Sequence, residues 1–357
     1  MPAPRSLKDL QSFLYTAVVP LGVWILVSLF YGKGFLAGSG TFECILFSLI
    51  AVAALVCLFE STAVPLLLQK LCLEYPIFSA GAALLVYGGV HLLKTTPVIA
   101  CAAIGTAAGL LGRSDDGTPG AYVPSAYCGG FVGMTSSLIL VSAWWIVLAG
   151  LLAGCLYSVS GEAIRGMGGK LGSIAFGSVF LTVLLAKSSM AIGPGPKLIR
   201  LDSAAKVAIL LASLCAAPIS YWLAQQRGLG PVLGSALPSV VVAITLPWLG
   251  HWVPFATGPV ATAWFGASFV GMTSPQRIAM RNWMLPVMGL LFGILWIGFK
   301  PPLVGLGGVL GATATVSVLG VLGGVRLVAG TRQAANPLGQ PVVPTCAVEE
   351  NRCLVAE

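Results

Sequence analysis

The hexapeptide FVGMTS occupies residues 131–136 and occurs again, unchanged, at residues 269–274. Six identical residues in a row rarely recur by chance in a chain of 357 residues. The similarity continues beyond the motif: GLLAGCLY from Gly150 parallels GLLFGILW from Gly289, and GGKLG from Gly168 parallels GGVLG from Gly307. A nearly constant spacing of this kind indicates an internal repeat. We therefore expect the chain to contain two related halves.

The repeat suggests a division of the chain into five parts. Residues 1–75 precede it and are expected to form two helices and an interfacial segment (64–76). Half A covers 76–192 and half B covers 206–326, joined by a linker at 193–205. The tail at 327–357 carries prolines and charges of both signs, and it is expected to be flexible because it offers little apolar surface to bury.

The composition predicts an all-α, polytopic membrane protein. Hydrophobic residues make up 57% of the chain and charged residues only 8%, against about 25% charged in soluble domains. Apolar runs of about 18 to 22 residues recur, which is the length that crosses a bilayer. The expected fold is about ten transmembrane helices plus two short re-entrant or broken helices. The predicted spans are 12–31, 41–59, 77–93, 97–112, 137–158, 171–191, 206–224, 231–249, 280–299 and 303–325.

The two segments before the motifs, 121–135 and 259–273, decide how the halves are related. They are apolar and rich in small residues, but each is short for a full span. If they are re-entrant, the halves are parallel; if each one crosses, the halves are inverted. The basic stretch from Lys187 to Lys206 is matched by Arg326 and Arg332 at the end of half B, and this favours parallel halves, since basic residues gather on the cytoplasmic side. Inverted repeats, common in transporters, are the alternative.

The motif itself has the pattern of a turn that leads into a helix. Ser274 is followed by Pro275, and serine at the N-cap with proline at the first helical position is a typical helix start. By alignment, a second helix is predicted to start at Ser137, capped by Ser136 or Thr135. Free N–H groups at such an end attract anions or carbonyl oxygens.

These considerations give the candidate substrate pathway, formed by both motifs and by the aromatic residue four positions before each. An alternative is that FVGMTS is a packing seam between helices, because small residues allow close approach in membranes. The GGKLG and GGVLG stretches lack the phosphate-loop pattern and are expected to pack helices. The candidate pathway residues are Tyr127, Gly133, Met134, Thr135, Ser136, Phe265, Gly271, Met272, Thr273 and Ser274.

The remaining motifs favour transport over catalysis. The chain has no HExxH or G-x-S-x-G motif, and no carboxylate lies deep within a predicted span, so neither an enzyme nor an ion-coupled pump is expected. His91 and His251 lack partners at ligand spacing, and neither a metal nor another cofactor is predicted. No basic cluster is dense enough for nucleic acid. We expect a channel or transporter for a small anion or a small neutral polar molecule. The alternative is a non-catalytic structural or assembly subunit of a larger membrane complex.

The net charge of +8 is interpreted as a sign of topology and not of a polyanionic ligand. The expected location is the cytoplasmic (inner or plasma) membrane, with both termini in the cytoplasm and the lipid bilayer as the main partner. The sequence leaves the oligomeric state open, a homo-oligomer included.

Overall fold

The computed structural model describes residues 73–113, 120–160, 166–188, 201–250, 252–253, 255–275, 282–298 and 305–333. Outside these residues lie the predicted helices at 12–31 and 41–59, most of the interfacial segment and the linker, the tail beyond residue 333, and His251. Two π or 3-10 turns accompany the α-helices: η1 Trp222–Gln226 extends α8, and η2 Val270–Met272 follows α10.

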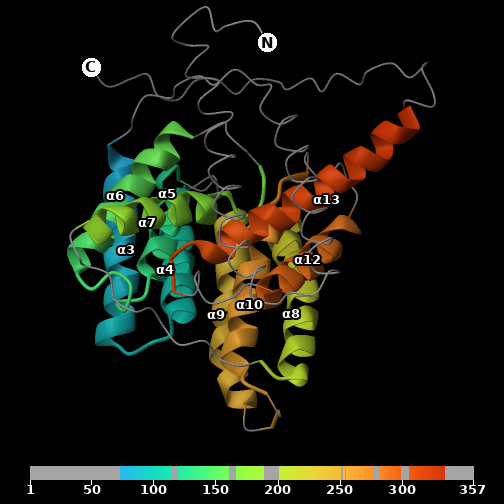
Figure 1. Ribbon diagram of the computed structural model, residues 1–357, viewed down its shortest axis with the longest axis horizontal. Coiled ribbons are helices and arrows are strands. Elements are labelled where there is room, and N and C mark those ends of the chain that lie inside the picture. The colour runs from blue at the N-terminus through green and yellow to red at the C-terminus, as the bar shows by residue number, and fades with distance from the viewer. Residues whose placement is uncertain are drawn as a thin grey trace, which may run out of the picture.

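The described residues form helices and no strand (Figure 1), which confirms the all-α class for this part of the chain. The α-helices are α3 Glu74–Leu92, α4 Pro97–Leu111, α5 Tyr122–Gly133, α6 Ala143–Val159, α7 Lys170–Ser188, α8 Ser203–Tyr221, α9 Pro231–Leu249, α10 Thr257–Ser268, α12 Met284–Gly298 and α13 Val309–Gln333.

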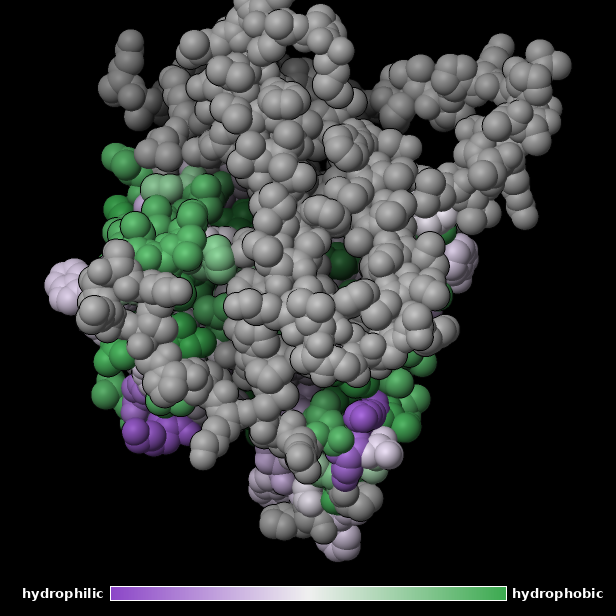
Figure 2. All heavy atoms as spheres, viewed as in Figure 1, coloured by the Kyte–Doolittle hydropathy of each residue, from purple (hydrophilic) through white to green (hydrophobic). Residues whose placement is uncertain are grey.

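Three of these helices are long and apolar enough to cross a membrane: α3, α8 with its η1 extension, and α9. Several outward-facing side chains are large and apolar, for example Leu85 and Leu211. Much of the visible surface of the described residues is hydrophobic, with hydrophilic residues toward its lower edge (Figure 2). A soluble protein rarely exposes large contiguous apolar patches. These features indicate a membrane protein.

Local capping explains where several helices begin. The Thr96 side chain accepts a hydrogen bond from the Ile99 N–H, and Pro97 occupies the first turn of α4. Asp202 caps α8 by accepting from the Ala205 N–H at 2.8 Å. Pro231 starts α9 after Gly230, whose φ of 77° places it in the region that favours glycine. The helix predicted at 231–249 has the same bounds in the structure, and glycine followed by proline marks its start.

Close glycine contacts fix the direction of the helices that pack on α3. A Cβ on two glycines of α5, or on two glycines of α6, would collide with the α3 backbone. Later residues of α5 contact later residues of α3, so α3 and α5 are parallel. Later residues of α6 contact earlier residues of α3, so α3 and α6 are antiparallel. The contacts are Gly129 with Ser79, Gly133 with Ala83, Gly150 with Ala80, and Gly154 with Pro76.

Helix α8 carries a similar set of contacts. Gly289 of α12 lies against Ser213, and Gly293, one turn later, lies against Leu210, so α8 and α12 are antiparallel. Gly271, in the second motif, lies against the carbonyl oxygen of Ala217. Small residues thus bring three backbones into direct contact here, as they do around α3.

Helices α4 and α9 pack side by side in opposite directions. Gly105 of α4 meets Ala236, Gly109 meets Leu233, and beyond the end of α4 the Arg113 Nη2 donates to the Gly228 carbonyl at 2.7 Å. Helices α7 and α13 are also antiparallel, because their closest point joins Gly172 to Gly311 while Gly169 faces Thr315 and Gly308 faces Phe176. The expectation that GGKLG and GGVLG pack helices agrees with this contact.

The path through the first motif differs from the expected re-entrant one. A re-entrant segment would return to its own side, and the next helix would then run parallel to α5. Instead, α5 is parallel to α3 and α6 is antiparallel to it, so the chain reverses direction between α5 and α6. Two helices also begin later in the chain than predicted: α6 begins at Ala143 and not near 137, and α13 begins at Val309 and not near 303.

Candidate functional site

The two FVGMTS copies lie at the ends of two short, buried helices. Helix α5 ends at Gly133 and α10 ends at Ser268, just before the second copy. Nearly every residue of α5 from Val123 to Gly133 is buried, as is most of α10. At 1.5 Å per residue, helices of 12 residues span about 18 Å. Most motif residues therefore lie inside the protein, while the methionine and serine of each copy are half-buried.

The motif threonines tie each copy to a glycine loop in the other half. The Thr135 hydroxyl donates to the Val132 carbonyl at 2.6 Å and accepts from the Gly307 N–H at 3.1 Å. The Thr273 hydroxyl does the same with the Val270 carbonyl and the Gly168 N–H, at the same two distances. Each hydroxyl thereby uses its only proton and one lone pair within the protein.

The motif serines add a second bond to the same loops. The Ser136 N–H donates to the Gly305 carbonyl at 2.8 Å, and the Ser274 N–H donates to the Gly166 carbonyl at 2.8 Å. These loops, 166–169 and 305–308, are called the glycine loops below. Each begins and ends with a glycine at positive φ, between 72° and 89°. Only glycine adopts such angles freely, which explains the first and last glycines of the shared G-x-G-G pattern. A Cβ on the remaining glycine would collide with a motif carbonyl, that of Phe269 at Gly168 and that of Phe131 at Gly307.

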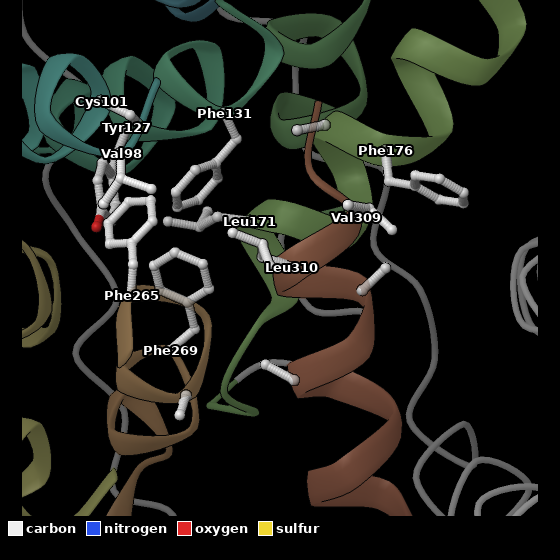
Figure 3. Packing of buried hydrophobic residues seen from close by; sticks show 14 of the residues in the cluster. Val98, Cys101, Tyr127, Phe131, Leu171, Phe176, Phe265, Phe269, Val309 and Leu310 are labelled. Carbon is white, nitrogen blue, oxygen red and sulfur yellow. The ribbon is translucent and has the colours of Figure 1, made fainter. Parts of the chain in front are cut away.

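Four aromatic rings fill the centre between α5 and α10 (Figure 3). They belong to Tyr127 and Phe131 of α5, to Phe265 of α10, and to Phe269, which directly follows α10. We call these four rings the aromatic quartet. The ring centroids of Phe131 and Phe269 are 4.8 Å apart. The flanking pairs match each other closely: 4.4 Å for Tyr127–Phe131 against 4.7 Å for Phe265–Phe269, and 6.1 Å for Phe131–Phe265 against 6.2 Å for Tyr127–Phe269.

All four rings are buried, with at most 2% of any residue exposed. Edge-to-face and tilted aromatic contacts of this kind add about 0.5–1.5 kcal/mol per pair beyond the burial of area. The quartet therefore forms a tightly packed contact between α5 and the end of α10. Tyr127 and Phe265, predicted to line a path, are brought together in it.

The predicted caps are only partly correct. The Ser136 hydroxyl accepts from the Leu138 N–H at 3.2 Å, but this turn ends before a helix forms. Helix α6 starts at Ala143, where the Ser142 side chain accepts from the Trp144 N–H. The prediction of a start at Ser137 was wrong, because a serine cap pattern occurs twice within seven residues. In the second copy Pro275 is helical, and the residues after it lie outside the described part.

The remaining predicted pathway residues divide by burial. Gly133 and Gly271 are buried against the α3 and α8 backbones. Met134, Ser136, Met272 and Ser274 are half-buried.

Sequence reasoning missed a group of buried hydroxyls beside the quartet. The Tyr127 hydroxyl lies 3.2 Å from the Ser235 Oγ, and the Ser239 Oγ donates to the Ser268 Oγ at 3.4 Å or to the Ser235 carbonyl at 2.7 Å. These residues come from three helices, so no local pattern in the sequence points to them.

The chemical character of this centre is aromatic and hydroxylic. Among the described residues, no group of three His, Cys, Asp or Glu side chains is placed to hold a metal ion. The available groups can hydrogen-bond, pack and exclude water. Comparison with protein-family models, with curated proteins and with solved structures finds no match to this chain.

Proposed function

We propose that this chain is an integral membrane transporter or channel that moves a small solute, either a small anion or a small neutral polar molecule, between two pseudo-symmetric halves. The observation that carries the proposal is the reciprocal bonding of the motifs: each FVGMTS copy binds the glycine loop of the opposite half through the same two bonds. The same bonds thus occur once in each half, on either side of the buried aromatic quartet. Transporters built from two repeats hold their substrate sites at such an interface between the repeats.

We further propose that the halves are inverted repeats, and not the parallel repeats favoured from the charge pattern. Helices in equivalent places pack antiparallel: α4 on α9, and α7 on α13. The matched distances of the aromatic quartet fit a two-fold axis passing between Phe131 and Phe269. If these helices cross the membrane, an axis perpendicular to them lies in the membrane plane, which is the symmetry of inverted repeats.

In this scheme each half crosses the membrane five times. Half A crosses with α3 to α7, and half B crosses with α8, α9, α10, α12 and α13. An odd number of crossings per half inverts the second half relative to the first. With the two helices predicted at 12–31 and 41–59, the total is even, so both termini lie on one side. This retains the expectation of cytoplasmic termini in the inner or plasma membrane.

Broken helices near the middle of the bilayer build the substrate sites of many inverted-repeat transporters. Helices α5 and α10 end inside the protein, next to one another, and the chain continues as turns at both motifs. The aromatic quartet separates the two sides of this centre. We interpret the conformation as closed, with transport requiring the rings to separate.

A competing proposal is that the chain is a structural or assembly subunit. One observation favours it: the hydroxyls of Thr135 and Thr273 are each engaged by protein groups on both sides, as expected of a packing seam.

Flux into proteoliposomes separates the two proposals. The purified protein is reconstituted, and the entry of small neutral and anionic solutes is compared with that into protein-free vesicles. Protein-dependent flux supports transport. No flux across the panel, together with a partner that co-purifies at fixed stoichiometry, would establish the subunit role instead.

A further inference from the structure

Four buried hydroxyls gather on one side of the aromatic quartet. They belong to Tyr127 of α5, to Ser235 and Ser239 of α9, and to Ser268 of α10, and we call them the hydroxyl cluster. Each residue is at most 1% exposed. The cluster joins half A to half B, because the Tyr127 hydroxyl lies 3.2 Å from the Ser235 Oγ across 108 residues of sequence.

The hydroxyl cluster and the aromatic quartet share a residue. Tyr127 contributes its ring to the quartet, 4.4 Å from Phe131, and its hydroxyl to the cluster. Ser268 is the residue before Phe269, and its hydroxyl donates to the Phe265 carbonyl at 2.6 Å. Because Tyr127 belongs to both groups, a movement that displaces its ring also moves one hydroxyl of the cluster.

The cluster has no counterpart at the equivalent positions around the proposed axis. Pro97 and Pro231 both begin the paired helices α4 and α9, and the motifs align α5 with α10. On this alignment Phe265 matches Tyr127, and none of the four equivalent residues carries a hydroxyl. The equivalent residues are Phe265 for Tyr127, Cys101 for Ser235, Gly105 for Ser239, and Gly130 for Ser268.

This asymmetry separates the cluster from ordinary packing. The same helix contacts form on the other side with a phenyl ring, a thiol and two glycines, for example where Gly130 lies against the Cys101 Sγ. Hydroxyls are therefore not required to pack these helices. Burying polar groups costs free energy unless each is bonded; the cluster hydroxyls are bonded, so their burial is tolerated, and their presence on one side alone is what distinguishes them.

The bonding of the cluster limits which solutes it suits. Ser235, Ser239 and Ser268 have their protons within reach of helix carbonyls, those of Val232, Ser235 and Phe265. A serine or tyrosine oxygen that donates once still has lone pairs to accept with. The spare capacity of the cluster is thus for accepting hydrogen bonds, and no member is charged. An ion would lose its hydration here without a counter-charge, at a high cost in free energy.

We propose that the hydroxyl cluster is the selecting contact of the pathway, and that it takes small uncharged solutes that donate hydrogen bonds, such as simple amides. This rests on the proposed transport function and narrows it by setting aside the small anion. The solute reaches the cluster when the quartet opens, and its N–H or O–H groups then bind to the oxygens of Tyr127, Ser239 and Ser268.

The test measures entry of acetamide and of formate into proteoliposomes that contain the full chain. Tyr127→Phe and Ser268→Gly each install the residue found at the equivalent position, so the fold has a precedent for both. Ser178→Ala is the matched control, because Ser178 is also buried and donates to a carbonyl of its own helix, that of Ile174, but lies outside the cluster. Elution of each variant by size exclusion checks its folding.

We expect acetamide entry through the unaltered protein to exceed formate entry, and each cluster variant to lower the acetamide rate roughly tenfold, with the control unchanged. Acetamide entry that is the same in both cluster variants as in the unaltered protein would refute the role of the hydroxyls. Formate entry without acetamide entry would refute the solute class while leaving transport intact. Entry of no solute at all would instead refute the proposed function itself.

Discussion

The Thr135 hydroxyl accepts a hydrogen bond from the Gly307 N–H at 3.1 Å, although the two residues are 172 positions apart in the chain. The Gly168 N–H donates to Thr273 in the same way, across 105 positions. Each motif threonine also donates to a carbonyl three residues before it. The hydroxyl is thus a link between the end of one short helix and the glycine loop of the opposite half.

Replacing these threonines by valine is expected to destabilise the protein. Valine keeps the shape but leaves the buried Gly307 or Gly168 N–H without its partner, which costs about 1–3 kcal/mol per site. The free energy of unfolding, measured for the purified protein in detergent, should fall for Thr135→Val and for Thr273→Val. Serine in place of either threonine restores the hydroxyl and should recover most of the loss.

Thr245→Val is the control for that prediction. Thr245 donates to carbonyls of its own exposed helix face, that of Val241 at 2.8 Å or that of Val242 at 3.4 Å. Its replacement should change the stability by less than about 0.5 kcal/mol. If Thr245→Val lowered the free energy of unfolding as much as Thr135→Val, the hydrogen bonds to the glycine loops would add no stability beyond that of an ordinary helix threonine.

Even a single methyl group should be poorly tolerated at the motif glycines. A Cβ at Gly133 would collide with the Ala83 carbonyl oxygen, and one at Gly271 would collide with that of Ala217. Alanine at either position must push α3 or α8 away, and overpacking of this kind costs about 1–3 kcal/mol. We expect Gly133→Ala and Gly271→Ala to lower the unfolding temperature, and a larger residue to prevent folding.

The matched control lies on the helix that Gly133 touches. Gly81 of α3 is exposed and has no neighbouring atom within 4 Å of an added Cβ. Alanine favours a helix over glycine by about 0.5–1 kcal/mol, so Gly81→Ala should be neutral or stabilising. Similar losses for Gly81→Ala and Gly133→Ala would show that helix propensity, and not close packing, decides the outcome.

The helices could be predicted from the sequence where the local signals were strong. Span 231–249 was correct because Gly230 and Pro231 mark its start, and GGKLG was correctly interpreted as packing because Gly172 meets Gly311. The reversal between α5 and α6 could not be predicted, since it depends on how both helices contact α3. The start of α6 was misplaced because Ser136 and Ser142 are equally good caps by type.

The hydrogen-bond partners of the motifs could not be predicted from the sequence either. Nothing near Thr135 indicates that its hydroxyl bonds to Gly307, because hydrogen bonds between distant segments leave no periodic signal. The glycine loops did carry one signal, the repeated G-x-G-G at 166–169 and 305–308. The pattern alone does not show that the first and last glycines of each loop adopt positive φ angles.

Inverted halves predict that equivalent loops lie on opposite sides of the membrane. Lys94 precedes α4 and Gln226 precedes α9; both are exposed. Helix α4 begins at Pro97, and beyond its other end Arg113 bonds to Gly228, so the two loops are separated by the length of α4, about 22 Å. Lys94→Cys and Gln226→Cys, each in a background without the nine native cysteines, should react with an impermeant thiol reagent from opposite faces of a vesicle. Reaction from the same face would support parallel halves.

Opening the aromatic quartet should make the pathway leak. Phe131 and Phe269 meet at 4.8 Å at its centre, and leucine in place of Phe131 removes the ring contacts while keeping a buried apolar side chain. We expect Phe131→Leu to raise the entry of acetamide into proteoliposomes and to weaken the preference for acetamide over formate, because the rings no longer seal the centre. Phe292→Leu removes a phenyl ring that is equally buried but packs in α12 against Gly266. A leak of similar size in both variants would reflect general loosening of the core, whereas a leak confined to Phe131→Leu places the barrier at the quartet, where the two short helices meet.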